Sequence, residues 1–137
     1  MKKQLDILLI EDNFLEIMKM KRTLSLLELN HTLTEAKDGE IALEILQGKN
    51  RFPDLILLDL NMPKISGIEF LEILKNSEDL RHIPTVILTT SDNKTDLEEC
   101  YKIGVSGYVL KPLKYEEYVK KIEAVLGYWS MNELKKY

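Results

Sequence analysis

Residues 54–63 read DLILLDLNMP, in which four consecutive apolar residues stop at an acid and a proline-containing turn. A short apolar run with polar residues or Gly and Pro on either side is typical of a strand buried on both faces, as in a parallel sheet. This run predicts a strand over 54–58, and similar runs predict strands over 6–10, 85–88 and 107–110. A weaker run over 31–36 alternates in part and predicts an edge or half-exposed strand.

The segments between these runs carry apolar residues at helical spacing. Five such sets are present: Ile17, Met20, Leu24 and Leu27; Ile41, Ile45 and Leu46; Ile68, Leu71 and Leu74; Leu97, Cys100 and Tyr101; Tyr118, Ile122 and Val125. Parallel strands need crossover connections, which are usually helices. The chain is therefore predicted to form one α/β domain, a doubly wound, five-stranded parallel sheet with five helices.

Composition excludes several classes of protein. The chain has 137 residues, of which 45% are hydrophobic and 31% charged, enough for a single packed core and unlike a disordered chain. Cys100 is the one cysteine, which excludes an intramolecular disulfide and a cysteine zinc site and suits a reducing compartment. The net charge of −4 gives no reason to expect nucleic acid, and no apolar run is long enough for a signal peptide or a membrane span. We expect a cytoplasmic domain.

Polar residues follow four of the predicted strands at the point where each strand ends. They are Glu11 and Asp12, then Asp59, then Thr89 and Thr90, and finally Lys111. In a doubly wound sheet, ligands bind beyond the carboxyl ends of the strands, so these side chains are expected at one edge. Carboxylate oxygens without His or Cys suit Mg²⁺, and an Asp can attack phosphorus to form an acyl phosphate. Lysine and hydroxyl groups can then hold the phosphoryl oxygens.

Each of these residues also has an ordinary structural interpretation. Asp12 or Asn13 can cap the following helix, and Asp59 can initiate a turn before Pro63. Thr89 and Thr90 are common at strand ends, and a lysine such as Lys111 is usually solvated. Their coincidence at successive strand ends favours a functional site.

These motifs resemble the receiver domains of two-component response regulators, the CheY-like group. The resemblance covers residues 5–126 and implies the strand order 2-1-3-4-5 of flavodoxin-like folds. It rests on the acidic pair, on the motif from Asp59 to Pro63 with Gly67, on Thr89, and on Lys111 followed by Pro112. Many members have Asp-Asp where this chain has Glu11 and Asp12.

The resemblance implies that Asp59 accepts a phosphoryl group from a sensor histidine kinase or a phosphotransfer protein. It implies that Asp12, Asp59 and the backbone carbonyl of Asn61 bind Mg²⁺, for which Mn²⁺ can substitute, and that Glu11 acts through a metal-bound water. Such a protein catalyses its own phosphorylation and dephosphorylation and is not otherwise an enzyme.

The resemblance also assigns roles on the fourth and fifth strands. Thr89 and the amide of Thr90 would bind phosphoryl oxygens, and Lys111 would pair with the phosphate. Tyr108 would be the switch residue, whose ring turns inward as Thr89 moves towards the phosphate. The Lys111–Pro112 peptide bond would be cis, as in the family.

Residues 1–127 are interpreted as the receiver domain, and residues 128–137 as a tail too short for an effector domain. Output would then come from contact with a downstream protein or with a second copy of the chain. Trp129 either packs on the last helix of its own subunit or helps to form a homodimer interface. The tail, residues 88–91 and residues 77–82 are similar to those of phytochrome-associated single-domain regulators. His31 and Cys100 are expected to be structural.

Two other functions fit the fold less well. A phosphohydrolase with an aspartate nucleophile would usually have a second Asp as general acid two residues later, where this chain has Asn61. A flavodoxin-like cofactor binder would place its phosphate after the first strand, where Glu11 and Asp12 would repel it.

Overall fold

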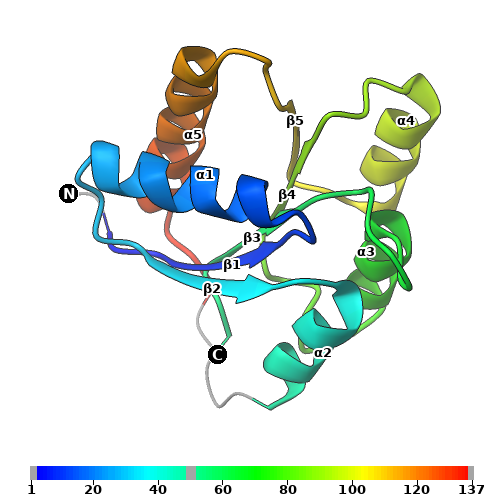
Figure 1. The fold of residues 1–137 in the computed structure, drawn as a ribbon. Coiled ribbons are helices and arrows are strands. Elements are labelled where there is room, and N and C mark those ends of the chain that lie inside the picture. The colour runs from blue at the N-terminus through cyan, green and yellow to red at the C-terminus, as the bar shows by residue number, and fades with distance from the viewer. Residues whose placement is uncertain (1–2, 49–51, 136–137) are drawn as a thin grey trace.

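The computed structural model describes residues 3–48 and 52–135, in which strands and helices alternate strictly along the chain (Figure 1). The strands are β1 (Asp6–Ile10), β2 (Thr32–Ala36), β3 (Leu55–Leu58), β4 (Thr85–Thr89) and β5 (Gly107–Leu110). The helices are α1 (Phe14–Leu26), α2 (Gly39–Gln47), α3 (Gly67–Lys75), α4 (Lys94–Ile103) and α5 (Tyr115–Ser130). The five strands and five helices predicted from the apolar runs are confirmed.

The strands form one parallel sheet in the order β2-β1-β3-β4-β5, as expected. Strand β2 is at one edge and is largely accessible to solvent, in agreement with its alternating sequence. The prediction for β5 was partly wrong, because its residues are half-buried or exposed and not buried on both faces. The reason is topological: β5 is the other edge strand and has a neighbour on one side alone.

Helices cover both faces of the sheet, as Figure 1 shows. Helices α1 and α5 pack on one face, where Ile17, Met20, Tyr118 and Ile122 join one apolar cluster. Helices α2, α3 and α4 pack on the other face and form a second cluster. The apolar set predicted for α4 was partly wrong, because Leu97 and Tyr101 are exposed and Cys100 is the buried residue of that helix.

The C-terminal end of α5 packs against the rest of the domain. Helix α5 continues to Ser130, so the expected boundary after residue 127 falls within a helix. Trp129 packs against the cluster beneath α1 and α5, and the buried Ser130 accepts a hydrogen bond of 2.9 Å from Lys3 N through its carbonyl. Tyr128 and Met131 are 57% and 63% exposed. Trp129 therefore packs within its own subunit, and its two exposed neighbours remain accessible.

No helix among residues 3–48 and 52–135 has both the length and the apolar character needed to cross a membrane.

Candidate functional site

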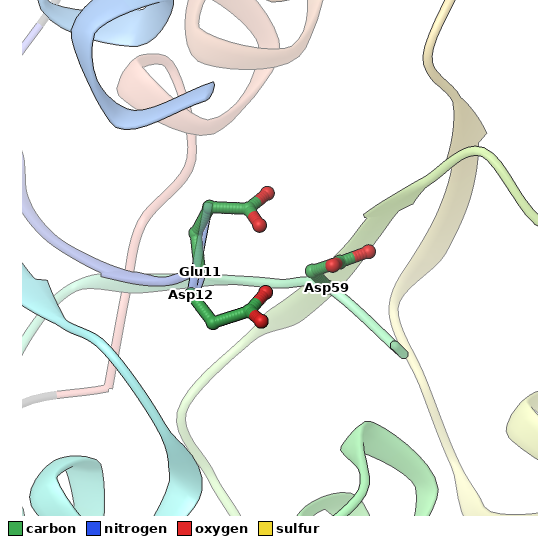
Figure 2. Close-up of side chains that lie close together, drawn as sticks. All are labelled: Glu11, Asp12 and Asp59. Atoms are coloured by element: carbon green, nitrogen blue, oxygen red, sulfur yellow. The ribbon is translucent and has the colours of Figure 1, made fainter. Parts of the chain in front are cut away.

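Three carboxylates converge beyond the carboxyl ends of β1 and β3 (Figure 2). Glu11, Asp12 and Asp59 each offer an oxygen, and these three oxygens lie within 4.8 Å of one another. Glu11 and Asp59 are buried, whereas Asp12 is exposed. The cluster is thus open to solvent on the side of Asp12. Closely placed oxygen ligands without His or Cys fit a hard divalent cation.

The turn after β1 directs its two acids into this cluster. Glu11 N donates to Ala36 O over 3.0 Å, which continues the pairing of β1 with β2 by one residue. Asn13 caps α1, because its side chain accepts hydrogen bonds from Leu15 N and Glu16 N. Helix capping therefore falls to Asn13, and the carboxylate of Asp12 is available to the acidic cluster.

The turn after β3 is shaped by a glycine. Asp59 N donates to Ile10 O over 3.1 Å, and Gly67 N donates to Leu60 O over 3.0 Å. A Cβ atom on Gly67 would lie 2.5 Å from both Asp59 O and the Cα of Leu60, which is too close for any side chain. Gly67 thus allows the start of α3 to pack directly on the backbone that carries Asp59.

Lys111 follows β5, which is two strands along the sheet from β3, and its side chain reaches the acids. Its Nζ lies 2.6 Å from Glu11 Oε1, 3.1 Å from Glu16 Oε1 and 4.0 Å from Asp59 Oδ1. The side chain is 7% exposed, so the solvated-lysine interpretation does not apply. Its backbone N donates to Thr89 O over 2.8 Å, which fixes the strand end.

Burial and neighbouring charges shift the pKa values of Glu11 and Lys111. Burial raises the pKa of Glu11 to about 7, although the hydrogen bond and charge of Lys111 act to lower it. Burial acts to lower the pKa of Lys111, but the hydrogen bond to Glu11 and the charges of Glu11, Asp59 and Glu16 raise it above its ordinary value. Lys111 is therefore a positively charged group at neutral pH, and Glu11 can gain or lose a proton there.

The remaining expected site residues are on β4 and β5 or in the turns that follow β3 and β4. Thr89 is buried at the end of β4, and among the described residues its Oγ1 is hydrogen-bonded to Ser91 N and not to the carboxylates. Thr90 is exposed, as is Asn61 in the turn after Asp59. Tyr108 packs against the cluster under α3 and α4, and its hydroxyl donates to Ser91 O over 2.8 Å. The tyrosine is thus half-buried and is tied to the loop after β4 by this hydrogen bond.

One expectation from the family resemblance is wrong. No cis peptide bond occurs in the described part of the chain, so the bond between Lys111 and Pro112 is trans. The trans form is the one that most X–Pro bonds adopt, because it is favoured by about 0.5–1 kcal/mol.

Sequence reasoning missed Glu16. Its carboxylate contacts Lys111 from the first turn of α1, five residues after Glu11. The sequence did contain a signal. The helix after the acidic pair begins at the same edge of the sheet, so an acid in its first turn is expected close to that edge.

Comparison with known proteins agrees with this geometry. Residues 7–123 match the family described as the response regulator receiver domain. The chain is 39% identical over 127 residues to the probable methanogenesis regulatory protein FilR2 of Methanothrix harundinacea, covering 90% of this chain and 82% of that protein. It is 34% identical over 128 residues to the response regulator Rcp1 of Synechocystis, covering 90% and 87%.

Solved structures of similar proteins share the fold. The phosphorylated cyanobacterial phytochrome response regulator RcpA superimposes with a TM-score of 0.90 at 31% identity, covering 97% of this chain and 99% of that one. The Mn²⁺-bound form of Rcp1 superimposes with a TM-score of 0.87 at 33% identity, covering 96% and 99%. The chain therefore belongs to the receiver domain family of two-component response regulators, with the CheY-like fold.

Proposed function

We propose that this protein is a response regulator of the cytoplasm, whose Asp59 accepts a phosphoryl group from a sensor histidine kinase or a phosphotransfer protein. The observation that carries the proposal is the placement of Asp59. Its carboxylate is within 4.8 Å of two other acids and 4.0 Å from the ammonium of Lys111. This arrangement suits a nucleophile that needs a divalent cation on one side and a fixed positive charge on the other.

The covalent step transfers one phosphoryl group without any redox change. An oxygen of the Asp59 carboxylate attacks phosphorus, and the bond between phosphorus and the imidazole nitrogen of the donor phosphohistidine breaks. The imidazole leaves with the bonding electron pair and takes up a proton. The product is an acyl phosphate on Asp59 and a neutral histidine on the donor.

The residues present fit Mg²⁺, with Mn²⁺ as a substitute, because the converging ligands are all carboxylate oxygens. In this proposal Asp12, Asp59 and the backbone carbonyl of Asn61 bind the cation, and Glu11 acts through a metal-bound water. When bound, the cation offsets negative charge on the acids and on the phosphoryl oxygens. The Mn²⁺-bound structure of Rcp1 supports a divalent cation in a relative of this chain.

The other strand ends would respond to the phosphoryl group. Lys111 supplies a positive charge to one oxygen, and the Thr89 hydroxyl and the Thr90 amide bind others. The Thr89 oxygen accepts a hydrogen bond from Ser91 N, so its own O–H is available to donate to a phosphoryl oxygen, and a movement of Thr89 towards the phosphoryl group would act on Ser91 through this bond. Because Tyr108 is hydrogen-bonded to Ser91 O, such a shift reaches the tyrosine through the same loop. Phosphorylation would thereby bias a conformational switch.

Phosphorylation by a small donor tests the proposal. Wild-type protein incubated with acetyl phosphate and Mg²⁺ should gain one phosphoryl group by intact mass. The variant Asp59→Asn should gain none and should keep the circular dichroism spectrum of the wild type. The matched control is Asp79→Asn, which neutralises an exposed aspartate and should be labelled normally. Label on Asp59→Asn would place the acceptor elsewhere, and rapid turnover of general phosphate esters would favour a hydrolase.

Output in this proposal occurs through contacts with a downstream protein or through a homodimer. Tyr128 and Met131 are exposed apolar residues of the tail that are available to a second copy, whereas Trp129 and Ser130 pack within the subunit. Mass in solution before and after phosphorylation, with and without Tyr128→Ser and Met131→Ser, tests this part. Point variants are preferable to removal of residues 128–137, which would take Trp129 out of the core. Equal masses in all samples would exclude Tyr128 and Met131 from an interface.

A further inference from the structure

The ammonium of Lys111 contacts two glutamates, of which one belongs to the acidic cluster and the other does not. Glu11 belongs to the acidic cluster suited to a cation, whereas Glu16 does not, although both contact the same ammonium at 2.6 and 3.1 Å. A lysine ammonium has three N–H donors, so it can serve both glutamates and a third acceptor together. The carboxylate oxygen Asp59 Oδ1 lies 4.0 Å from the same ammonium.

Glu16 is itself held in place from the opposite side. It is in the first turn of α1, where one carboxylate oxygen faces Lys111 and the other lies 3.1 Å from Lys19 Nζ. The Lys19 ammonium in turn lies 4.4 Å from the centre of the buried Tyr118 ring of α5. Burial acts to raise the pKa of Glu16, but the charges and hydrogen bonds of Lys111 and Lys19 hold it below its ordinary value. Glu16 is therefore an ionised, oriented carboxylate.

A cation in the acidic cluster would change the interactions of the Glu11 carboxylate. The same carboxylate that pairs with Lys111 would then face the cation and its water, and the cation would repel the ammonium. The attraction between Lys111 and Glu11 would then be weaker during the phosphorylation of Asp59, when the proposed function requires the ammonium to lie beside Asp59. Glu16 lies outside the cluster and can keep its contact with the ammonium unchanged.

We propose that Glu16 is a positioning residue, which retains the Lys111 ammonium beside Asp59 while Glu11 serves the cation. The inference rests on the function proposed above, in which Asp59 is phosphorylated in the presence of a divalent cation. It adds to that function a residue of α1 that acts through Lys111 and does not touch the phosphoryl group.

The variant Glu16→Gln tests this role, because it removes the charge and keeps the size of the side chain. At saturating Mg²⁺, labelling by acetyl phosphate should slow by about tenfold, since a misplaced charge stabilises the phosphoryl oxygens less well. The matched control is Glu35→Gln, which removes the same charge and an ion pair of 2.6 Å to Lys21 without touching Lys111. That control should be labelled at the rate of the wild type.

A double variant separates positioning from a merely structural role. If Glu16 acts through Lys111, then Glu16→Gln should cause no further slowing in a Lys111→Met background. Equal labelling of Glu16→Gln and wild type would overturn the inference, as would an equal slowing in both backgrounds.

A second measurement does not depend on phosphorylation. Slow acylation of lysine amines, followed by peptide mass spectrometry, reports how freely Lys111 moves in the Mg²⁺-loaded protein. Lys111 should react several-fold faster in Glu16→Gln than in wild type or Glu35→Gln, and equal rates would overturn the inference. If wild type takes no label from acetyl phosphate, the proposed function fails, while the reactivity of Lys111 still decides the role of Glu16.

Discussion

The ammonium of Lys111 is 2.6 Å from a carboxylate oxygen of Glu11 and is therefore paired with the acid that belongs to the cation cluster. The phosphoacceptor proposed here is further away, at 4.0 Å. A divalent cation bound in the acidic cluster would therefore compete with Lys111 for the carboxylate of Glu11.

Removal of the lysine should make the protein depend on the cation. In Lys111→Met, the buried Glu11 and Asp59 lose their positive partner, which should lower the free energy of unfolding by about 3 kcal/mol without metal. Mg²⁺ should restore more stability than it does in wild type, because it no longer competes with an ammonium. Thermal unfolding with and without MgCl₂ measures both effects.

The control for this experiment is Lys94→Met, which breaks an exposed ion pair of 3.8 Å with Glu98 and should cost almost nothing. A smaller response to Mg²⁺ in Lys111→Met than in wild type would show that the two cations do not compete.

Cation affinity should depend on pH near neutrality. Because burial raises the pKa of Glu11 to about 7, this carboxyl is increasingly protonated below that pH and increasingly ionised above it. A protonated carboxyl attracts a cation less, so Mn²⁺ affinity should fall as the pH is lowered from 8 to 6. In Glu11→Gln, affinity should be low and nearly constant over this range. Calorimetric titration with Mn²⁺ provides the test, and a variant that retains the wild-type pH dependence would assign it to another group.

Gly67 should not tolerate a side chain. In Gly67→Ala the new Cβ would lie 2.5 Å from backbone atoms of Asp59 and Leu60, so the turn must move. We expect a loss of about 1–3 kcal/mol in the free energy of unfolding and slower labelling by acetyl phosphate. In Gly107→Ala the new Cβ would meet Val86 at 3.6 Å, an ordinary contact, and the variant should be close to wild type. Denaturant unfolding of both variants distinguishes them, and equal stabilities would mean that the turn adapts without cost.

His31 should stabilise the fold in its neutral form. Its Nδ1 accepts a hydrogen bond of 2.9 Å from Leu5 N, and burial lowers the pKa of His31 below 6.5. The unfolded chain then binds more protons than the native chain, so this contribution is complete above pH 6.5 and is lost as the pH falls through the native pKa. The variant His31→Ala should lose about 1–2 kcal/mol at pH 7.5. The difference from wild type should shrink as the pH is lowered, and parallel stability curves down to pH 5 would contradict this assignment.

The strands and their shared edge were predictable because each apolar run is continuous and each ends in a polar residue. Once the strands are parallel, Glu11, Asp59 and Lys111 must project from the same edge of the sheet. The partial burial of β5 was less predictable, because a run of apolar residues does not show which strand lies at the edge of the sheet. The exposure of Leu97 and Tyr101 was not predictable from their spacing, because a helical repeat does not show how much of a helix face is covered by the rest of the domain.

Side-chain partners beyond the strand ends were harder to predict. Glu16 reaches Lys111 across 95 residues of sequence, and its direction depends on where α1 crosses the sheet. The trans bond before Pro112 was mispredicted for a different reason. The expectation of a cis bond came from the family resemblance, and the sequence alone does not determine the isomer of this bond. The packing of Trp129 was left open from composition and became evident once α5 extended to Ser130.

The acids and the lysine of the site come from β1, β3 and β5, and β4 separates the last two strands. No contiguous half of the polypeptide contains all of them. A nascent chain still being translated, or one cleaved by a protease between β3 and β5, would have the proposed nucleophile without its lysine. Phosphoryl transfer to such a chain would lack the positive charge of Lys111 and would be slower than in copies whose last strand has docked.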